Sequence, residues 1–531
     1  MNLVNAPRTI QQQPRSTSWS RLNYVFLTLC ATLYLLPFMR LLQSGADEGT
    51  VIYGAERIVH GQVFARDFFD VMGPGTFYLL AVFFKILGTT FLATRVCLFI
   101  ISLGTGVLMY FLSCRVCERY RWLPCIILAC TSFGGFWPGS SYHVDGNFFA
   151  LSAVACVVLW RETSWSVLLV AAGVLAGLTT CFLQPKGGLI LIALLVWLWI
   201  QRHKGAASIS SMGLVVGGYL GATGAAAAYF WSQGALGSLY FANVVWPSRH
   251  YGTVNSIPYA QGIIAWNWDH LIMIKNGLHG PAAIVVIGIV VILITPLFFV
   301  AALPVLTPLS ALFSVLASRE KWRIMTPIIM LYGLCGVALW MSEMHRLDIN
   351  HLVFGSPLLM ILFTYCMEVT SRKYADWTLQ LVAMTCFWLG TFNFLGALTA
   401  HSIATPIGSV AIFKDDPVLR YIVKNIAVGE EMFVYPYHPA YYFLSSTINP
   451  TRYSLLMYNY NTDEEFYDAI RSIEQSRTRY VIWDTGLLAY VKDYFPTSNR
   501  EAKSGLIMEP YLESHYKVLK EIDGVRIMER K

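Results

Sequence analysis

Long hydrophobic runs separated by short polar segments fill the first 400 residues of the chain. A helix needs about 17–25 mostly apolar residues to cross the hydrocarbon core of a bilayer. On that basis we predict about eleven membrane-spanning helices. Their expected ranges are 22–42, 91–113, 123–139, 146–161, 166–183, 187–201, 211–231, 280–302, 324–341, 350–370 and 377–398. The motif Gln184-Pro185-Lys186-Gly187-Gly188 predicts a break between two of them, and Pro296, Pro304 and Pro308 predict a broken or re-entrant helix over 296–318.

Two shorter patterns follow the first predicted span. Val51–Val59 is amphipathic, and Thr76–Leu87 is apolar but would extend only about 18 Å as a helix, too short to cross a bilayer of about 30 Å. Gly73-Pro74-Gly75 separates the two. Residues 43–90 are therefore predicted to form one long outer loop with two helices lying on the membrane surface.

The pattern changes beyond residue 405, where charged residues increase and helical and strand periodicities alternate. This predicts a small α/β domain over 405–531. Its expected helices and strands are a helix at Pro417–Ile426, a strand at Met432–Tyr435, a helix at Glu464–Ile473, a strand at Arg479–Trp483, and a hairpin of Tyr516–Ile522 with Val525–Glu529.

Composition agrees with a membrane protein. Of 531 residues, 56% are hydrophobic and 13% charged, and the mean hydropathy is +0.53, whereas soluble domains are about 25% charged. The net charge of +7 lies in short loops, which indicates topology rather than nucleic-acid binding. Every second predicted loop is basic, so we expect a cytoplasmic tail over 1–21, a transmembrane module over 22–400, and the α/β domain outside. Asn-x-Ser/Thr sequons with a permitted middle residue are missing, which favours a bacterial cytoplasmic membrane.

Polar and charged side chains gather in four places on the predicted outer side. Asp47-Glu48 follows the first span, with Asp67 later in the same loop. The other groups are His143 with Asp145, the isolated Lys186, and the segment containing Arg346, Asp348 and His351. Transfer of a sugar from a lipid phosphate needs a carboxylate that deprotonates the acceptor and cations that hold the departing phosphate. Asp47 or Glu48 could be that base, and Lys186, Arg346 and His351 could bind the phosphate.

Each feature also has a purely structural interpretation. Asp47-Glu48 could be the acidic first turn of a surface helix. His143 and Asp145 could cap a span, Arg346 and Asp348 could form an ion pair, and Lys186 could be a snorkelling lysine. Their common position on one side of the membrane favours the functional interpretation.

The sequence resembles the GT-C superfamily of polyprenyl-phosphate-sugar-dependent glycosyltransferases, and in particular its protein O-mannosyltransferase and aminoarabinose-transferase branch. The resemblance rests on Asp47-Glu48, the segment Tyr53–Val63, Arg66-Asp67-Phe68, Gly73-Pro74-Gly75, and the pattern Arg346-x-Asp348-x-x-His351. It implies an α-helical polytopic fold with an extracytoplasmic α/β domain and an early catalytic aspartate.

The resemblance also implies roles for individual residues. Asp47 would be the general base, assisted by Glu48, and Lys186, Arg346 and His351 would bind the donor phosphate. The acceptor or sugar would contact residues drawn from three of the polar groups, namely Asp67, His143, Asp145 and Asp348. An Asp-x-Asp motif is missing, so metal independence is expected, although a divalent metal stays possible.

The expected function is transfer of a monosaccharide, with inversion, from a polyprenyl-phosphate donor to an extracytoplasmic glycan, lipid or protein. Two alternatives are open: a transporter or flippase for a lipid-linked glycan, and a polymerase or ligase. A transporter would place charges near the bilayer midplane and often shows internal repeats. A polymerase or ligase would carry a large, late loop rich in Arg and His. The chain shows neither pattern.

Overall fold

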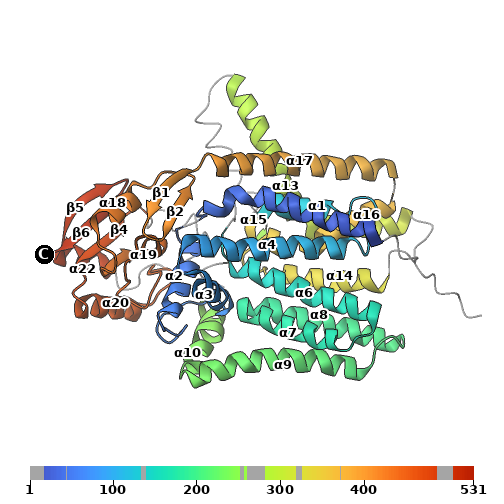
Figure 1. Cartoon of the computed structure of the whole chain (residues 1–531), viewed down its shortest axis with the longest axis horizontal. Coiled ribbons are helices and arrows are strands. Elements are labelled where there is room, and N and C mark those ends of the chain that lie inside the picture. Colours follow the sequence, from blue (N-terminus) through green and yellow to red (C-terminus); the bar gives the residue numbers. More distant parts are fainter. Residues whose placement is uncertain are drawn as a thin grey trace, which may run out of the picture.

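The computed structural model describes residues 17–43, 45–132, 139–251, 256–259, 281–317, 326–370, 372–486 and 506–531. Most of the predicted cytoplasmic tail therefore lies outside the described residues. Long helices run roughly side by side, and a smaller sheet-containing domain sits at one end of them (Figure 1).

Every predicted span coincides with a helix. These helices are α1 (Thr17–Leu35) with the 3₁₀ turn η1 (Leu36–Arg40), α4 (Phe91–Ser113), α5 (Leu123–Ser132), α6 (Tyr142–Thr163), α7 (Val167–Phe182), α8 (Gln184–His203), α9 (Ile209–Ser232), α13 (Pro281–Ala317), α14 (Pro327–Met341), α15 (Ile349–Gly355), α16 (Pro357–Thr370) and α17 (Arg372–Leu398). Within the described residues, seven are long and apolar enough to cross a membrane, or eight if the bent pair α15–α16 is one span. The other three, α5, α7 and α14, are shorter apolar helices.

The three prolines of α13 do not interrupt it, so the predicted break over 296–318 is wrong. Prolines are tolerated in such helices because neighbouring helices, Ser and Thr side chains and small local adjustments satisfy the carbonyls that have lost their donor. The predicted break after α7 is confirmed, since α8 starts at Gln184 with Pro185 in its first turn. A bend that the sequence pattern did not predict lies between α15 and α16, which meet at 69°.

The two short helices predicted after the first span are confirmed as α2 (Asp47–Val59) and α3 (Gly75–Leu87). They lie between the long helices and the sheet domain (Figure 1). One face of α3 buries Phe77 and Phe84, whereas Val82 and Ile86 are exposed. The short helix α10 (Leu236–Tyr240) and two π-helical turns, Phe241–Val245 and Pro247–Tyr251, follow α9 on the same side.

The domain after α17 begins with a hairpin of β1 (His401–Thr405) and β2 (Gly408–Ile412), which the sequence pattern did not predict. A four-stranded sheet follows in the order β3-β4-β6-β5. Its strands are β3 (Met432–Tyr435), β4 (Tyr480–Asp484), β5 (Tyr516–Ile522) and β6 (Val525–Arg530), with helices α18 (Pro417–Asn425), α19 (Ala440–Ser445), α20 (Asp463–Gln475) and α22 (Met508–His515). All the predicted helices and strands of this domain are confirmed.

The sheet domain and the first outer loop share one hydrophobic core. The rings of Tyr53 in α2 and Tyr442 in α19 stack at a centroid distance of 4.9 Å, and Phe84 in α3 stacks on Phe443 at 5.5 Å. Burial of such aromatic pairs contributes about 0.5–1.5 kcal/mol beyond the area that they bury. The sheet domain is thus attached to the segment that carries Asp47.

Candidate active site

Asp47 begins α2 and is half-buried. The hydroxyl of Tyr437 donates a hydrogen bond to its Oδ1 at 2.7 Å, and Thr50 Oγ1 donates to the Tyr437 oxygen at 3.4 Å. Tyr437 lies in the outer domain between β3 and α19. A carboxylate at a helix N-terminus is also stabilised by the helix dipole. Asp47 is therefore held in one orientation by two parts of the chain that lie far apart in sequence.

Asp70 lies near this pair. Burial, together with the negative charge of Asp47, raises the pKa of Asp70 to about 6, although the backbone N–H of Met72 donates to its Oδ1 at 2.9 Å. The structure thus places a second carboxylate, whose pKa is raised, beside the predicted base.

Glu48 is buried, with 1% of its surface exposed. Its Oε1 accepts from Arg95 Nη2 at 2.6 Å and from the backbone N–H of Ser140 at 2.9 Å, and its Oε2 accepts from the backbone N–H of Gln43 at 2.9 Å. Arg95 in α4 is equally buried. Both oxygens of Glu48 are thus occupied by holding the outer end of α4 and the segment before α6 against α2.

That segment leads directly to a second group of charges. Ser141 caps α6, and His143 follows in its first turn. His143 Nδ1 lies 3.0 Å from Glu343 Oε2, and the Lys186 ammonium lies 2.8 Å from Glu343 Oε1. Lys186 also donates to Asn147 Oδ1 at 2.6 Å. One carboxylate therefore neutralises one ammonium at a position that is fully shielded from water.

Glu343 was not among the residues predicted from the sequence. It precedes the motif that starts at Arg346 by three residues, just after α14, and its side chain is 0% exposed. The charges of His143 and Lys186 hold the pKa of this carboxyl well below its usual range against the effect of burial. Its position next to a recognised polar motif was a signal that could have identified it.

Asp348, His351 and Arg346 form the adjoining ion-pair group. Asp348 caps α15 by accepting from the backbone N–H of His351 at 3.1 Å. Its two oxygens lie 2.7 Å from His351 Nδ1 and 2.7 Å from Arg346 Nε, and these partners hold its pKa well below the usual range. The His143 and His351 rings meet edge to face at 4.8 Å, so the two groups are continuous. Arg346 is the most exposed cation here, at 18%.

The other two predicted residues lie apart from this network. Asp145 is buried in the first turn of α6. Asp67 is bound to its neighbour Arg66 at 2.8 Å and to the backbone N–H of Val63 at 2.7 Å, beyond the far end of α2 from Asp47. Hydrogen bonds from the Arg66 guanidinium lower the pKa of Asp67. The roles of both residues toward a sugar or acceptor stay predictions.

Among the described residues, His143, Glu343 and His351 place potential metal-ligand atoms within 4.8 Å of one another. The Lys186 ammonium is bonded to the same carboxylate, and Asp348 occupies His351 Nδ1. A cation at this position would have to displace a lysine that already supplies positive charge, so the donor set fits an internal ion network better than a metal centre.

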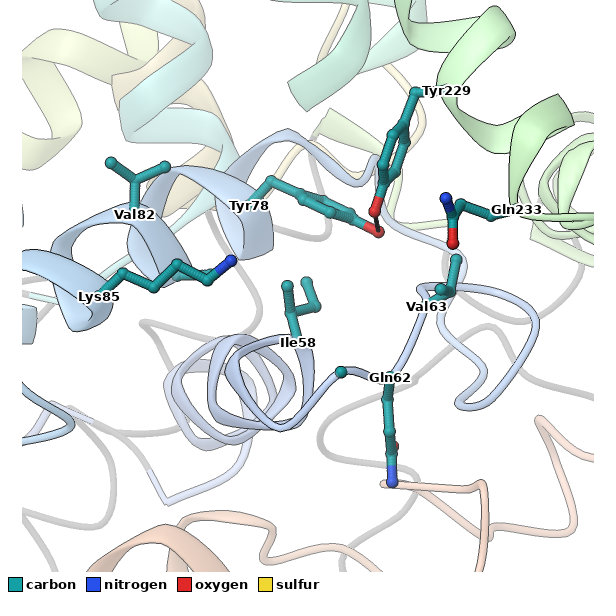
Figure 2. Close-up of a pocket in the computed structure, with 10 residues that line it drawn as sticks. Ile58, Gln62, Val63, Tyr78, Val82, Lys85, Tyr229 and Gln233 are labelled. Atoms are coloured by element: carbon teal, nitrogen blue, oxygen red, sulfur yellow. Dashed lines mark hydrogen bonds between the residues drawn. The ribbon is translucent and has the colours of Figure 1, made fainter.

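One cavity reaches the charged network, and a second lies apart from it. An apolar cavity of about 510 Å³ runs between α1, α4, α5 and α6, and Asn147 and Phe354 line it where it reaches the charged network. A more polar cleft of about 420 Å³ lies at the far end of α2. Figure 2 shows its lining, with the Lys85 side chain directed toward the space beside Tyr78 and the hydroxyls of Tyr78 and Tyr229 close together; these hydroxyls lie 3.3 Å apart.

The arrangement of the helices, with the sheet domain at one end of them, is also found in solved structures of other proteins. Among solved structures, ArnT from Cupriavidus metallidurans bound to undecaprenyl phosphate matches with a TM-score of 0.56 at 12% identity, over 97% of this chain and 98% of that chain. The apo state of the same protein gives 0.56 at 13% identity, over 96% and 98%.

The archaeal oligosaccharyltransferase AglB from Archaeoglobus fulgidus, in complex with an inhibitory peptide and a dolichol-phosphate, gives a TM-score of 0.52 at 12% identity, over 97% of this chain and 75% of that chain. No protein-family model and no curated protein matches the sequence. The apolar helices indicate an integral membrane protein, and its likeness to ArnT and AglB is in fold rather than in sequence.

Proposed function

We propose that the chain is a membrane glycosyltransferase that moves a monosaccharide, a hexose or a pentose, from a polyprenyl-phosphate donor to an acceptor hydroxyl outside the cytoplasmic membrane. The observation that carries the proposal is the setting of Asp47. This carboxylate begins α2, is half-buried, and has one oxygen fixed by Tyr437. The fold likeness to ArnT and AglB, one bound to undecaprenyl phosphate and the other to a dolichol-phosphate, supports the donor class.

The proposed reaction is a single displacement. The acceptor oxygen attacks the anomeric carbon of the sugar, the bond from that carbon to the phosphate oxygen breaks, and the acceptor proton passes to Asp47. The products are an inverted glycoside and polyprenyl phosphate. The phosphate leaves without prior protonation, so a base is needed but a separate general acid is not.

Cations would stabilise the charge that develops on the departing phosphate. Arg346 is the best placed of the three predicted cations, because 18% of its side chain is exposed and Asp348 orients its Nε. His351 stands beside it, held by the same carboxylate. Lys186 is fully buried and already paired with Glu343, so we assign it to the electrostatic support of this group rather than to direct contact.

In the proposed orientation, the sheet domain lies outside the cytoplasmic membrane and faces the acceptor, which could be a glycan, a lipid or a protein. Salt bridges support this topology. Arg115 pairs with Glu162 at 2.9 Å, and Arg119 pairs with Asp376 at 2.6 Å. They join predicted inner loops at the end of the helices opposite the sheet domain (Figure 1).

Purified protein assayed with polyprenyl-phosphate-linked sugars tests the proposal. We expect Asp47→Asn to lower transfer by about 100-fold to 10,000-fold, the usual contribution of a general base. Asp415→Asn is the matched control, because Asp415 is an exposed carboxylate of the outer domain, paired with Arg420. Full transfer by Asp47→Asn would refute the mechanism.

A further inference from the structure

The segment Tyr437–Ala440 of the outer domain is pressed against the start of α2. The backbone N–H of Ala440 donates to the carbonyl of Gly45 at 3.0 Å. A Cβ atom on Gly45 would lie 1.8 Å from the His438 ring, and one on Gly49 would lie 2.4 Å from the Ala440 nitrogen. Any side chain at either glycine would therefore collide with the outer domain. Glycines on both sides of Asp47-Glu48 permit a closer approach than any other residue would allow.

This approach delivers the Tyr437 hydroxyl to Asp47. Its 2.7 Å bond to Oδ1 has the length of a hydrogen bond to a charged oxygen, which is about twice as strong as one between neutral groups. Thr50 Oγ1 lies 3.4 Å from the same hydroxyl and 3.2 Å from the carbonyl of Ala46. The direction of the bond follows from Asp47 itself, because an ionised carboxylate can only accept. Within the described residues, Oδ2 of Asp47 makes no hydrogen bond and is left to act on a substrate.

We propose that Tyr437 is a positioning residue that aims Asp47 at the acceptor, so that the outer domain completes the active site. The inference rests on the proposed function for the identity of Asp47 as the base. The physical reason is orientation. A carboxylate free to rotate presents its reactive oxygen correctly for only part of the time, and a misplacement of about 1 Å can cost about 100-fold in rate.

The test compares the variants Tyr437→Phe and Tyr441→Phe. The second is a matched control, because Tyr441 lies four residues further on and also donates its hydroxyl to an aspartate, Asp416, at 3.0 Å. We expect Tyr437→Phe to lower kcat by about 10-fold to 100-fold, the range expected for a lost hydrogen bond to a charged group. The KM for the polyprenyl donor should stay within about twofold, since the cations that bind the phosphate are untouched. Tyr441→Phe should change neither constant beyond about twofold.

A double-mutant cycle tests the contact independently of turnover. Asp47→Ala and Tyr437→Phe each remove the same bond, so the fall in Tm of the double variant should be smaller than the sum of the two single falls. The same non-additivity is expected in kcat.

Additive falls in Tm, or a Tyr437→Phe variant with wild-type kcat, would overturn the inference. Wild-type protein that transfers sugar from none of the polyprenyl donors would instead overturn the proposed function, and the Tm cycle would still decide whether Tyr437 holds Asp47.

Discussion

Asp47 and Glu48 are adjacent carboxylates in different surroundings, and replacing each in turn should separate the proposed role of Asp47 in catalysis from that of Glu48 in stability. Glu48→Gln keeps the shape of the side chain but removes its charge. The variant leaves Arg95 buried with 1% exposure beside a neutral amide. It also weakens the hydrogen bonds that the carboxylate accepts from Ser140 and Gln43.

Removing one partner of a buried ion pair typically costs about 3–5 kcal/mol, because the remaining charge has lost its compensation. A loss of 1 kcal/mol lowers Tm by about 2–4 °C in a cooperative unit of 150–250 residues, and by less in a larger unit. We therefore expect Glu48→Gln to lower Tm by roughly 3–10 °C. Its transfer activity, measured below the new Tm, should stay within about an order of magnitude of wild type.

Thermal unfolding in detergent, followed by tryptophan fluorescence, measures the first effect, and the transfer assay measures the second. Asp47→Asn is the matched comparison and should show the reverse pattern, with a Tm near that of wild type and transfer largely lost. Arg95→Met combined with Glu48→Leu removes both charges and should recover part of the lost stability. A Glu48→Gln variant with unchanged Tm and abolished transfer would show that Glu48, rather than Asp47, acts in the reaction.

Three further predictions concern the other buried charges. Burial raises the pKa of Glu56 to about 8, so the stability that this group contributes is complete below its usual pKa and is lost as pH rises through 8. Glu56→Gln should therefore gain stability relative to wild type between pH 5 and 8, by about 3 kcal/mol at pH 7. Tm curves of the two proteins that run parallel across that window would contradict this. Glu343→Gln should lower stability by about 3–5 kcal/mol, and adding Lys186→Met should cost far less than the sum of the two single changes; simple additivity would mean that the pair is not coupled. Transfer should survive extensive dialysis against EDTA because the Lys186 ammonium occupies the carboxylate that a metal would need, and activity restored only by an added divalent cation would refute this.

Local sequence patterns predicted most of the fold. Apolar runs located the membrane helices, amphipathic spacing located α2 and α18, and the Asp523-Gly524 turn located the last hairpin. Each of these patterns involves residues close together in the sequence, and the contrast between the apolar membrane and the water on either side enforces it. The break predicted at the prolines of α13 failed because helix packing overrides a local preference. The hairpin β1–β2 was missed because it begins three residues after α17 ends.

The candidate site was predicted only in part. The residue types on the outer side were recognisable, but their pairing was not. Glu343 lies 200 residues from His143, and Tyr437 lies 390 residues from Asp47. No periodicity reports such contacts.

The 390 residues that separate Asp47 from Tyr437 also delay the formation of their contact while the chain is being synthesised. Ribosomes add about 5–20 residues per second, so roughly 20–80 s separate the synthesis of these two residues. During that interval, the aromatic side chains of α2 and α3 lack their stacking partners Tyr442 and Phe443. A nascent or truncated chain lacks the Tyr437 contact with Asp47, so under the proposed mechanism it should not transfer sugar until the last quarter of the protein has folded.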